Sequence, residues 1–182
     1  MVEKKMAILH TAASLFHQKG FHNVGLKEIL DAVNIPKGSF YHYFSSKEKL
    51  VLDIMDIYIE DTLSLTESVD QSIDGLRDFF NIFFDRVIGM NLKQGCPVGN
   101  LILEISDEKE EYREKLQIWY KIIEDWAVDI LMTANVPDAY DKACMMISNY
   151  EGVIMMARLN KNAVYFKQFE NIFFNSLLKK AV

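Results

Sequence analysis

Residues 26–48 read LKEILDAVNIPKGSFYHYFSSKE, and this stretch decides the fold. Its first seven residues predict a short helix, because leucine and isoleucine recur at helical spacing on one face. The next four predict a turn, since Asn34 tolerates a positive φ and Pro36 disfavours helix at the residue before it. A second short helix is expected over 37–43. Helix, tight turn and helix together predict a helix-turn-helix, which presents the start of its second helix to base edges in the major groove of DNA.

The aromatic run at residues 40–44 has a second interpretation, because aromatic residues also favour β-strands. The flanking residues argue against a strand. Pro36 and Gly38 precede the run, and a capping box follows it. In that box Ser45 and Glu48 stand three residues apart, which is the spacing that starts a helix. We therefore expect a longer helix to begin at about residue 47.

Helical periodicity extends outward over the whole chain, and the three prolines fall at breaks between helical patterns. The predicted fold is all-α, with an N-terminal three-helix helix-turn-helix head at residues 1–46 and a C-terminal helical bundle body at residues 47–182. About nine helices are expected, at residues 3–19, 26–32, 37–43, 47–63, 72–91, from a loop at 94–100 to Ile105, and at 108–133, 137–160 and 161–180.

The charge of the chain is unevenly distributed. A net charge of −6 argues at first sight against a nucleic-acid partner. Residues 1–50 nevertheless carry +3 and all four histidines, while the remainder carries −9. A basic head on an acidic body would be steered end-on toward a polyanion. Small charge asymmetries are common, so this one gives only mild support for DNA binding.

Composition excludes several other classes of protein. Every apolar stretch is interrupted well short of the ~20 residues that a membrane span needs, and no apolar signal core follows Met1. We therefore expect a cytoplasmic protein with no membrane partner. Cys96 and Cys144 are too few and too far apart for a disulfide framework or a zinc cluster, and no metal or cofactor is expected. The sequence lacks the motifs of metal-dependent, phosphate-binding and serine-nucleophile enzymes, which predicts that the chain is not an enzyme.

The predicted second helix carries side chains suited to contact with DNA. A lysine at its start can reach a guanine edge or a phosphate, and a serine can donate to or accept from either. A glycine between them lets the backbone approach DNA closely. Tyrosine and histidine offer polar tips for phosphate oxygens, and lysines lie on the flanking helices. The predicted DNA contacts are Lys27, Lys37, Gly38, Ser39, Tyr41, His42 and Lys47.

Three segments together resemble the tetracycline-repressor (TetR/AcrR-like) family. They are AASLFHQKGF at 12–21, LKEILDAV at 26–33 and KGSFYHYFSSKE at 37–48, with the spacing of that family. The resemblance covers about residues 7–52. It implies an all-α homodimer with a variable C-terminal body for ligand binding and dimerisation. It also implies that Lys37, Gly38, Ser39, Tyr41, His42 and Lys47 supply DNA contacts.

Gly25 departs from the pattern of many family members, which place Ser or Thr before the second helix. Glycine is an acceptable N-cap but lacks the hydroxyl that touches phosphate. Backbone amides, Lys27 and Tyr41 are therefore expected to carry more of that anchoring. The Gly25 form, together with residues 95–101 and 151–158, resembles the subgroup of Bacillus multidrug and flavonoid-type repressors.

The body is rich in aromatic and methionine side chains at helical spacing. Such stripes are most often core, yet flexible methionines and flat aromatics also suit a pocket for a hydrophobic or aromatic compound. The family resemblance implies an effector pocket in this body. The polar candidates Asn100, Asn149 and Glu151 could equally be core residues whose hydrogen bonds are satisfied within the protein. The predicted effector-binding residues are Phe80, Phe84, Asn100, Trp119, Trp126, Met146, Asn149, Tyr150 and Glu151.

The last two helices are the expected dimer face. Apolar residues follow helical spacing on both, and small residues on the first of them let a partner helix come close. A dimer is also needed mechanistically, because two heads on a two-fold axis read two half-sites of a palindrome. The predicted interface residues are Met145, Gly152, Met155, Leu159, Tyr165, Phe169, Ile172 and Phe173.

The leading hypothesis is a ligand-responsive repressor. It would bind a palindromic double-stranded DNA operator as a homodimer and be released by a small hydrophobic or aromatic effector. The alternative is a thiol-based redox-sensing DNA-binding regulator that uses Cys96 or Cys144.

Overall fold

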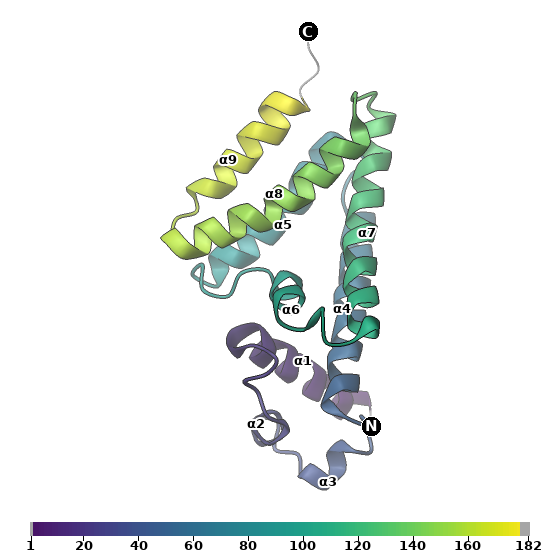
Figure 1. The fold of residues 1–182 in the computed structure, drawn as a ribbon, viewed down its shortest axis with the longest axis vertical. Coiled ribbons are helices and arrows are strands. Elements are labelled where there is room, and N and C mark those ends of the chain that lie inside the picture. The colour runs from purple at the N-terminus through teal and green to yellow at the C-terminus, as the bar shows by residue number, and fades with distance from the viewer. Residues whose placement is uncertain (1, 179–182) are drawn as a thin grey trace. The chain divides into compact units, whose positions relative to one another are not determined.

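Helices make up nearly all regular structure in residues 2–178, the part of the chain that this computed structural model describes. The all-α prediction is confirmed, and no strand occurs in these residues (Figure 1). In chain order the nine α-helices of these described residues are α1 (Val2–Lys19), α2 (Leu26–Ala32), α3 (Lys37–Phe40), α4 (Lys47–Ser68), α5 (Ile73–Gly89), α6 (Pro97–Ile105), α7 (Glu110–Thr133), α8 (Ala139–Asn160) and α9 (Val164–Ile172).

The predicted breaks between helices are confirmed, with changes at some ends. Helix α3 ends at Phe40 instead of residue 43, because the following amides bond three residues back and tighten the chain into a turn. The last predicted helix ends as α9 at Ile172 and continues as a π-helical turn, Phe173–Leu177. The last four residues of the chain lie outside the described residues.

The capping box predicted at Ser45 and Glu48 is wrong by one residue. Helix α4 begins at Lys47, so Ser46 occupies the N-cap position. Its Oγ accepts from the backbone N–H of Lys49 at 3.2 Å and satisfies one of the free amides at the helix start.

The described residues separate into two compact units. The first contains residues up to Glu60 together with Pro97–Gln117, and the second contains Asp61–Cys96 and the residues from Ile118 onward. Helices α4 and α7 contribute to both units. The domain boundary placed between residues 46 and 47 stays a prediction.

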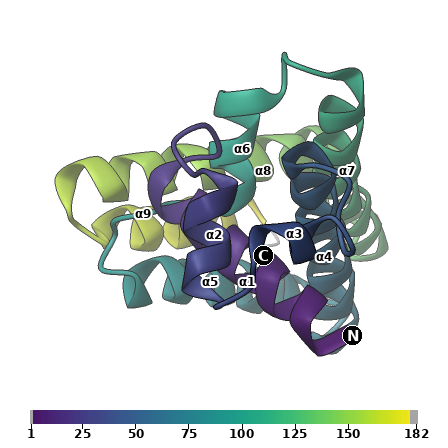
Figure 2. The ribbon, with the colours of Figure 1, turned by 90° about the horizontal axis from the view of Figure 1, so that it is seen from below.

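The first unit holds the helix-turn-helix. Figure 2 views its four N-terminal helices from below. Helix α2 packs against both α1 and α3. Asn34 has a φ of 54° in the turn between α2 and α3, as its residue type predicted. The core of these helices is apolar and is formed by Ile8, Ala12, Phe16, Ile29, Leu30, Phe40, Phe44, Leu50 and Ile54.

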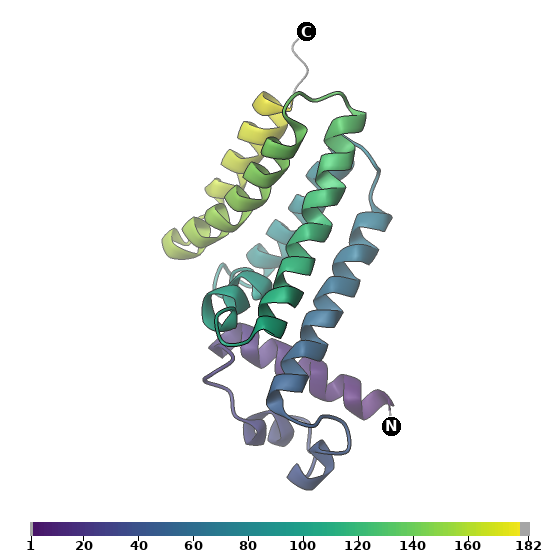
Figure 3. The same ribbon diagram turned by 45° about the vertical axis from the view of Figure 1, so that its right-hand side comes forward.

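The second unit is built on α5, α8 and α9. Helix α8 packs on α9 and on α5, and Figure 3 shows α8 and α9 running side by side. Aromatic rings fill the space between these helices, and Phe84 stacks on Phe166 with ring centroids 4.4 Å apart. The Oγ of Ser72 caps α5 by accepting from the N–H of Gly75 at 3.2 Å. None of the described helices is long and apolar enough to cross a membrane.

Candidate nucleic-acid interface and neighbouring sites

Helix α3 is held in place by buried aromatic rings. The side chain of Phe40 is completely buried and stacks on Phe44, with ring centroids 5.5 Å apart. Lys5 places its Nζ 5.3 Å from the centre of the Phe44 ring, which joins α1 to this pair. These contacts fix one side of α3 inside the first unit, so its other side is presented outward.

The outward side carries most of the predicted DNA contacts. Tyr41 is 56% exposed, directly beside the buried Phe40. No acidic side chain in residues 2–178 forms an ion pair with Lys27 or Lys37. Both lysines therefore keep their charge available for a polyanion. Of the predicted set, Lys27, Lys37, Gly38, Tyr41 and His42 are exposed, and Ser39 is half-buried.

Lys47 differs from the other predicted contacts because its ammonium is already engaged. Its Nζ donates to the backbone carbonyl of Phe21 and lies 4.0 Å from the centre of the Phe21 ring. Burial lowers the pKa of Lys47, while the neighbouring carboxylates of Glu104, Glu48 and Glu108 act in the opposite direction. Lys47 thus connects α4 to the turn at Phe21, and a DNA phosphate would have to compete with the Phe21 carbonyl for the Lys47 ammonium.

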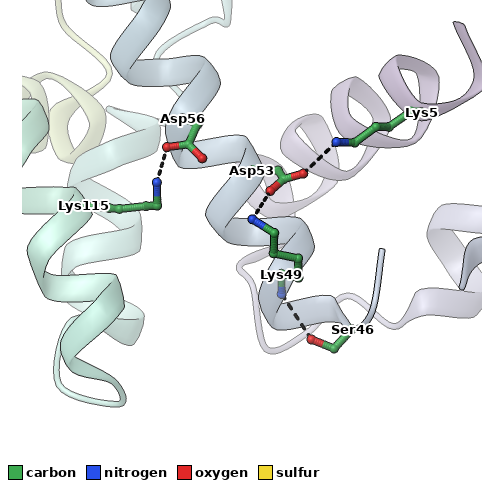
Figure 4. A network of polar contacts seen from close by, with 6 residues as sticks. All are labelled: Lys5, Ser46, Lys49, Asp53, Asp56 and Lys115. Atoms are coloured by element: carbon green, nitrogen blue, oxygen red, sulfur yellow. Dashed lines mark hydrogen bonds and ion pairs between the residues drawn. The ribbon is translucent and has the colours of Figure 1, made fainter. Parts of the chain in front are cut away.

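A small ionic network ties α1 to α4 (Figure 4). The carboxylate of Asp53 accepts from Lys49 at 2.6 Å and from Lys5 at 3.0 Å, and its side chain is only 14% exposed. Burial alone would raise the pKa of Asp53, but the hydrogen bonds from both lysines outweigh it and lower the pKa. Lys115 pairs separately with Asp56 further along α4.

Asp53→Asn is expected to lower the free energy of unfolding by about 1–2 kcal/mol at pH 7, since both lysines are partly exposed and screened by water. Because the folded-state pKa of Asp53 is lowered, its contribution is present above the unfolded-state value of about 3.9 and is lost as pH falls through the folded-state value. Urea unfolding at a series of pH values should show that the difference in the free energy of unfolding between wild type and Asp53→Asn becomes smaller below about pH 4.

Asp56→Asn is the matched control, since it removes a carboxylate that is 43% exposed from the same helix. It should cost no more than about 0.5 kcal/mol. Equal losses of stability from the two substitutions would contradict a larger stabilising role for Asp53 than for Asp56.

The predicted effector residues fall into two sets. Phe80, Phe84, Met146, Tyr150 and Trp119 are buried in the second unit, and the ring of Tyr150 lies 5.5 Å from that of Phe80 and 5.7 Å from that of Phe84. Asn100 belongs instead to α6 in the first unit. Its assignment to the effector site stays a prediction.

Both tryptophan N–H groups of the second unit form hydrogen bonds, whereas one buried asparagine oxygen forms none within the described residues. The indole N–H of Trp119 donates to Thr62 at 2.8 Å, and that of Trp126 donates to Gln71 at 2.7 Å. The Oδ1 of Asn149 is buried with no hydrogen-bond partner in the described part of the chain. An unpaired buried acceptor is costly, so this oxygen is the polar group here that is ready to receive a donor.

Glu151 takes part in a buried polar cluster with a residue that the sequence did not single out. The hydroxyl of Tyr120 donates to Glu151 Oε1 at 2.9 Å. Burial raises the pKa of Glu151, even though hydrogen bonds from Cys96 and Tyr120 lower it. Tyr150 also bonds to Cys96, and burial raises the pKa of its hydroxyl. Tyr120 was missed because its partner lies 31 residues away on another helix, and no spacing rule connects them.

The predicted dimer residues divide into exposed and buried groups. Met145, Met155, Leu159 and Ile172 are exposed, while Gly152 and Tyr165 are half-buried. Phe169 and Phe173 are buried within the chain and pack against each other with ring centroids 4.8 Å apart, so they belong to the core of the second unit, and a role for them in an interface stays a prediction. Phe169 faces the core because two rings of α5 pack against it, Phe80 at 5.1 Å and Phe84 at 5.2 Å between ring centroids.

Two family models match the chain. Residues 8–54 match the model of bacterial regulatory proteins of the tetR family, and residues 72–172 match the C-terminal domain of LmrA/YxaF-like transcriptional regulators. Together they cover the helix-turn-helix and most of the second unit.

Curated relatives agree with these models. The chain is 32% identical to the transcriptional regulator AcuR of Cereibacter sphaeroides over 78% of this chain and 70% of AcuR. It is 26% identical to the transcriptional repressor DhaR of a Mycobacterium species over 94% and 90% of the two chains. It is 31% identical to the repressor NemR of Escherichia coli over 60% and 56%.

Solved structures have the same fold. A regulatory protein TetR from Rhodobacter sphaeroides superposes with a TM-score of 0.84 at 24% identity, covering 93% of this chain and 96% of that one. The reduced form of E. coli NemR gives a TM-score of 0.82 at 23% identity, covering 99% and 100%. The relatives named above are described as regulators or repressors. The chain belongs to the TetR family of bacterial regulatory proteins, and it is a DNA-binding transcriptional regulator.

Proposed function

We propose that the chain is a ligand-responsive repressor that binds a palindromic operator as a homodimer and is released by a small hydrophobic or aromatic effector. The observation that carries the DNA-binding part is that the short helix α3 contains the buried Phe40 and the exposed Lys37, and is followed directly by the exposed Tyr41. The buried rings hold the helix rigidly, and the exposed polar groups are free for base edges and phosphates. Repression is supported by the similarity to DhaR and NemR, which are both described as repressors.

Lys37→Ala is expected to weaken binding to the operator by about 10- to 100-fold and to relax specificity at the base that it contacts. The operator can be identified by selecting DNA from a random library with the wild-type protein, and binding is then measured by gel shift. Lys27→Ala is the control, because an exposed lysine on α2 is expected to contact phosphate only. It should weaken binding to all sequences alike and reduce the salt slope by about 1. Equal weakening of all sequences by Lys37→Ala would contradict base readout.

The dimer part of the proposal is supported by exposed apolar side chains on α8 and α9. Leu159 is 75% exposed, and Met145 and Met155 share its helix. A monomer rarely leaves such a run in water, so a second copy of the chain is the occupant that we propose.

Met155→Glu is expected to convert the dimer to monomer in sedimentation experiments, because a buried unpaired charge in an interface costs several kcal/mol. Met132→Glu is the matched control, since Met132 is comparably exposed on α7 and outside the predicted interface. A monomeric wild type, or equal dissociation of both variants, would contradict this assignment of the interface.

The effector part rests on the buried aromatic and methionine side chains around Tyr150 and on the unpaired oxygen of Asn149. Flat aromatic compounds with a hydrogen-bond donor match this chemistry. A panel of flavonoids and other planar phenols provides the probe, with binding read from quenching of the two tryptophans. Compounds that bind should release operator DNA in a gel shift, and binding without release would contradict the repressor mechanism.

A thiol-based redox response is the second candidate. It is supported by the likeness of this fold to a structure described as the reduced form of NemR, and by the contacts of Cys96 with Tyr150 and Glu151. Burial raises the pKa of the Cys144 thiol, which disfavours its reactive thiolate. Hydrogen peroxide should then lower operator affinity in wild type and Cys144→Ser, but not in Cys96→Ser. Unchanged affinity in wild type would dispose of this candidate.

A further inference from the structure

The turn between α1 and α2 is completed by a residue from a distant part of the chain. The backbone N–H groups of Phe21 and His22 donate to the two carboxylate oxygens of Glu104, each at 2.8 Å. Glu104 lies on α6, more than 80 residues later in the sequence, and within the same compact unit. A carboxylate that accepts two backbone N–H bonds makes charge-assisted hydrogen bonds, which are stronger than neutral ones.

Gly20 makes room for this carboxylate. A Cβ atom at position 20 would lie 3.0 and 3.1 Å from the two carboxylate oxygens of Glu104. Gly20 also has a φ of +89°, a conformation that other residues rarely adopt. The turn is therefore shaped to let the end of the Glu104 side chain lie directly against the backbone.

The opposite side of the same turn is bound by α4. Lys47 donates to the carbonyl of Phe21 and covers its ring, so Phe21 is held at its N–H by α6 and at its C=O by α4. His22 places its Nε2 2.7 Å from Glu108, just beyond α6. We call Glu104, Lys47 and the turn Gly20–His22 the clasp.

Helix α2 has no cap of its own that could replace the clasp. Its N-cap residue is Gly25, which forms no side-chain hydrogen bond to the helix start. The chain enters α2 only a few residues after His22, so the position of the turn sets the position of α2. Since α2 packs on α3, the same contact sets the direction in which α3 presents its exposed residues.

We propose that Glu104 is a positioning residue for operator recognition, and that through the clasp it holds α2 and α3 in the orientation that reads base edges. The inference rests on DNA binding by the helix-turn-helix and is independent of any effector. A positioning role for Glu104 predicts a change in operator affinity opposite in sign to the change that electrostatics alone predicts. Removing a negative charge from a DNA-binding head should strengthen binding to a polyanion, whereas loss of a positioning residue should weaken binding to the operator.

The test compares Glu104→Ala, Glu104→Gln and the control Glu108→Gln. Affinity is measured for the operator selected by the wild type and for an unrelated duplex of equal length. Glu104→Ala should weaken operator binding about tenfold, the size of a lost charge-assisted contact, and leave binding to the unrelated duplex unchanged or stronger. Glu108→Gln removes the same charge near the same turn and keeps an acceptor for His22, so operator binding should be retained.

Amide hydrogen exchange reports the clasp directly. The amides of Phe21 and His22 should exchange faster in Glu104→Ala, and Glu104→Gln should show faster exchange with an intermediate operator affinity, because it keeps one acceptor oxygen. If Glu104→Ala does not fold, the test rests on Glu104→Gln, because glutamine has nearly the same shape as the wild-type glutamate. Faster exchange at both amides with wild-type affinity for the operator would overturn the role of Glu104. Failure of the wild type to select any sequence would instead overturn sequence-specific DNA binding itself.

Discussion

Phe40→Ala will lower the free energy of unfolding by about 3–5 kcal/mol and abolish operator binding. The cost has this size because Phe40 is completely buried and the surrounding helices cannot collapse fully into the space that it leaves. Phe44 would lose its stacking partner at the same time. Urea unfolding followed by circular dichroism measures the stability, and a gel shift measures the binding.

Tyr41→Ala is the control for this experiment, because Tyr41 is the adjacent residue and faces solvent. Its substitution should change the free energy of unfolding by less than about 1 kcal/mol and still weaken DNA binding. The two substitutions thus separate the side of α3 that holds the fold from the side that contacts DNA. A stability loss from Tyr41→Ala as large as that from Phe40→Ala would contradict this division.

Gly75→Ala is expected to lower the free energy of unfolding by about 3 kcal/mol or more, at the upper end of overpacking costs. A Cβ atom on Gly75 would lie 1.8 Å from the carbonyl oxygen of Asp70. That neighbour is backbone, so relief requires the chain before α5 to move and Ser72 to give up its capping bond. A thermal melt should show a clearly lowered Tm.

Gly89→Ala tests the same substitution at the other end of α5. No atom lies within 4 Å of the Cβ that it would add, and alanine is the better helix former. This variant should be unchanged or stabilised by up to about 1 kcal/mol. A similar loss of stability at both positions would show that the close approach of Asp70 is not the cause.

Local chemistry allowed most of the fold to be predicted from the sequence. Asn34 and Pro36 marked the turn of the helix-turn-helix because one tolerates a positive φ and the other restricts its neighbour. The spacing of Phe40 and Phe44 separated the buried side of α3 from its exposed side. The helix cap was placed wrongly where two adjacent serines could both act as N-cap: Ser46, not Ser45, caps α4.

The parts that could not be predicted depend on contacts between distant residues. Tyr120 bonds to Glu151, and Glu104 bonds to the turn at Phe21, but no periodicity connects these positions. The sequence placed Phe173 and Ile172 in one apolar stripe, but the structure buries Phe173 against Phe169 and leaves Ile172 exposed. A stripe of apolar residues predicts that a helix has a partner, without saying which one.

The contact between Glu104 and the α1–α2 turn is made through backbone N–H groups alone. Every non-proline residue supplies such a donor, so positions 21 and 22 can change in related proteins without breaking the contact. Pairwise covariation, which detects side chains that change together, would therefore find no signal linking position 104 to either of them. The constraint should fall instead on Gly20, where any added side-chain atom meets the carboxylate. We therefore expect related sequences that keep this long-range contact to have glycine at the position of Gly20.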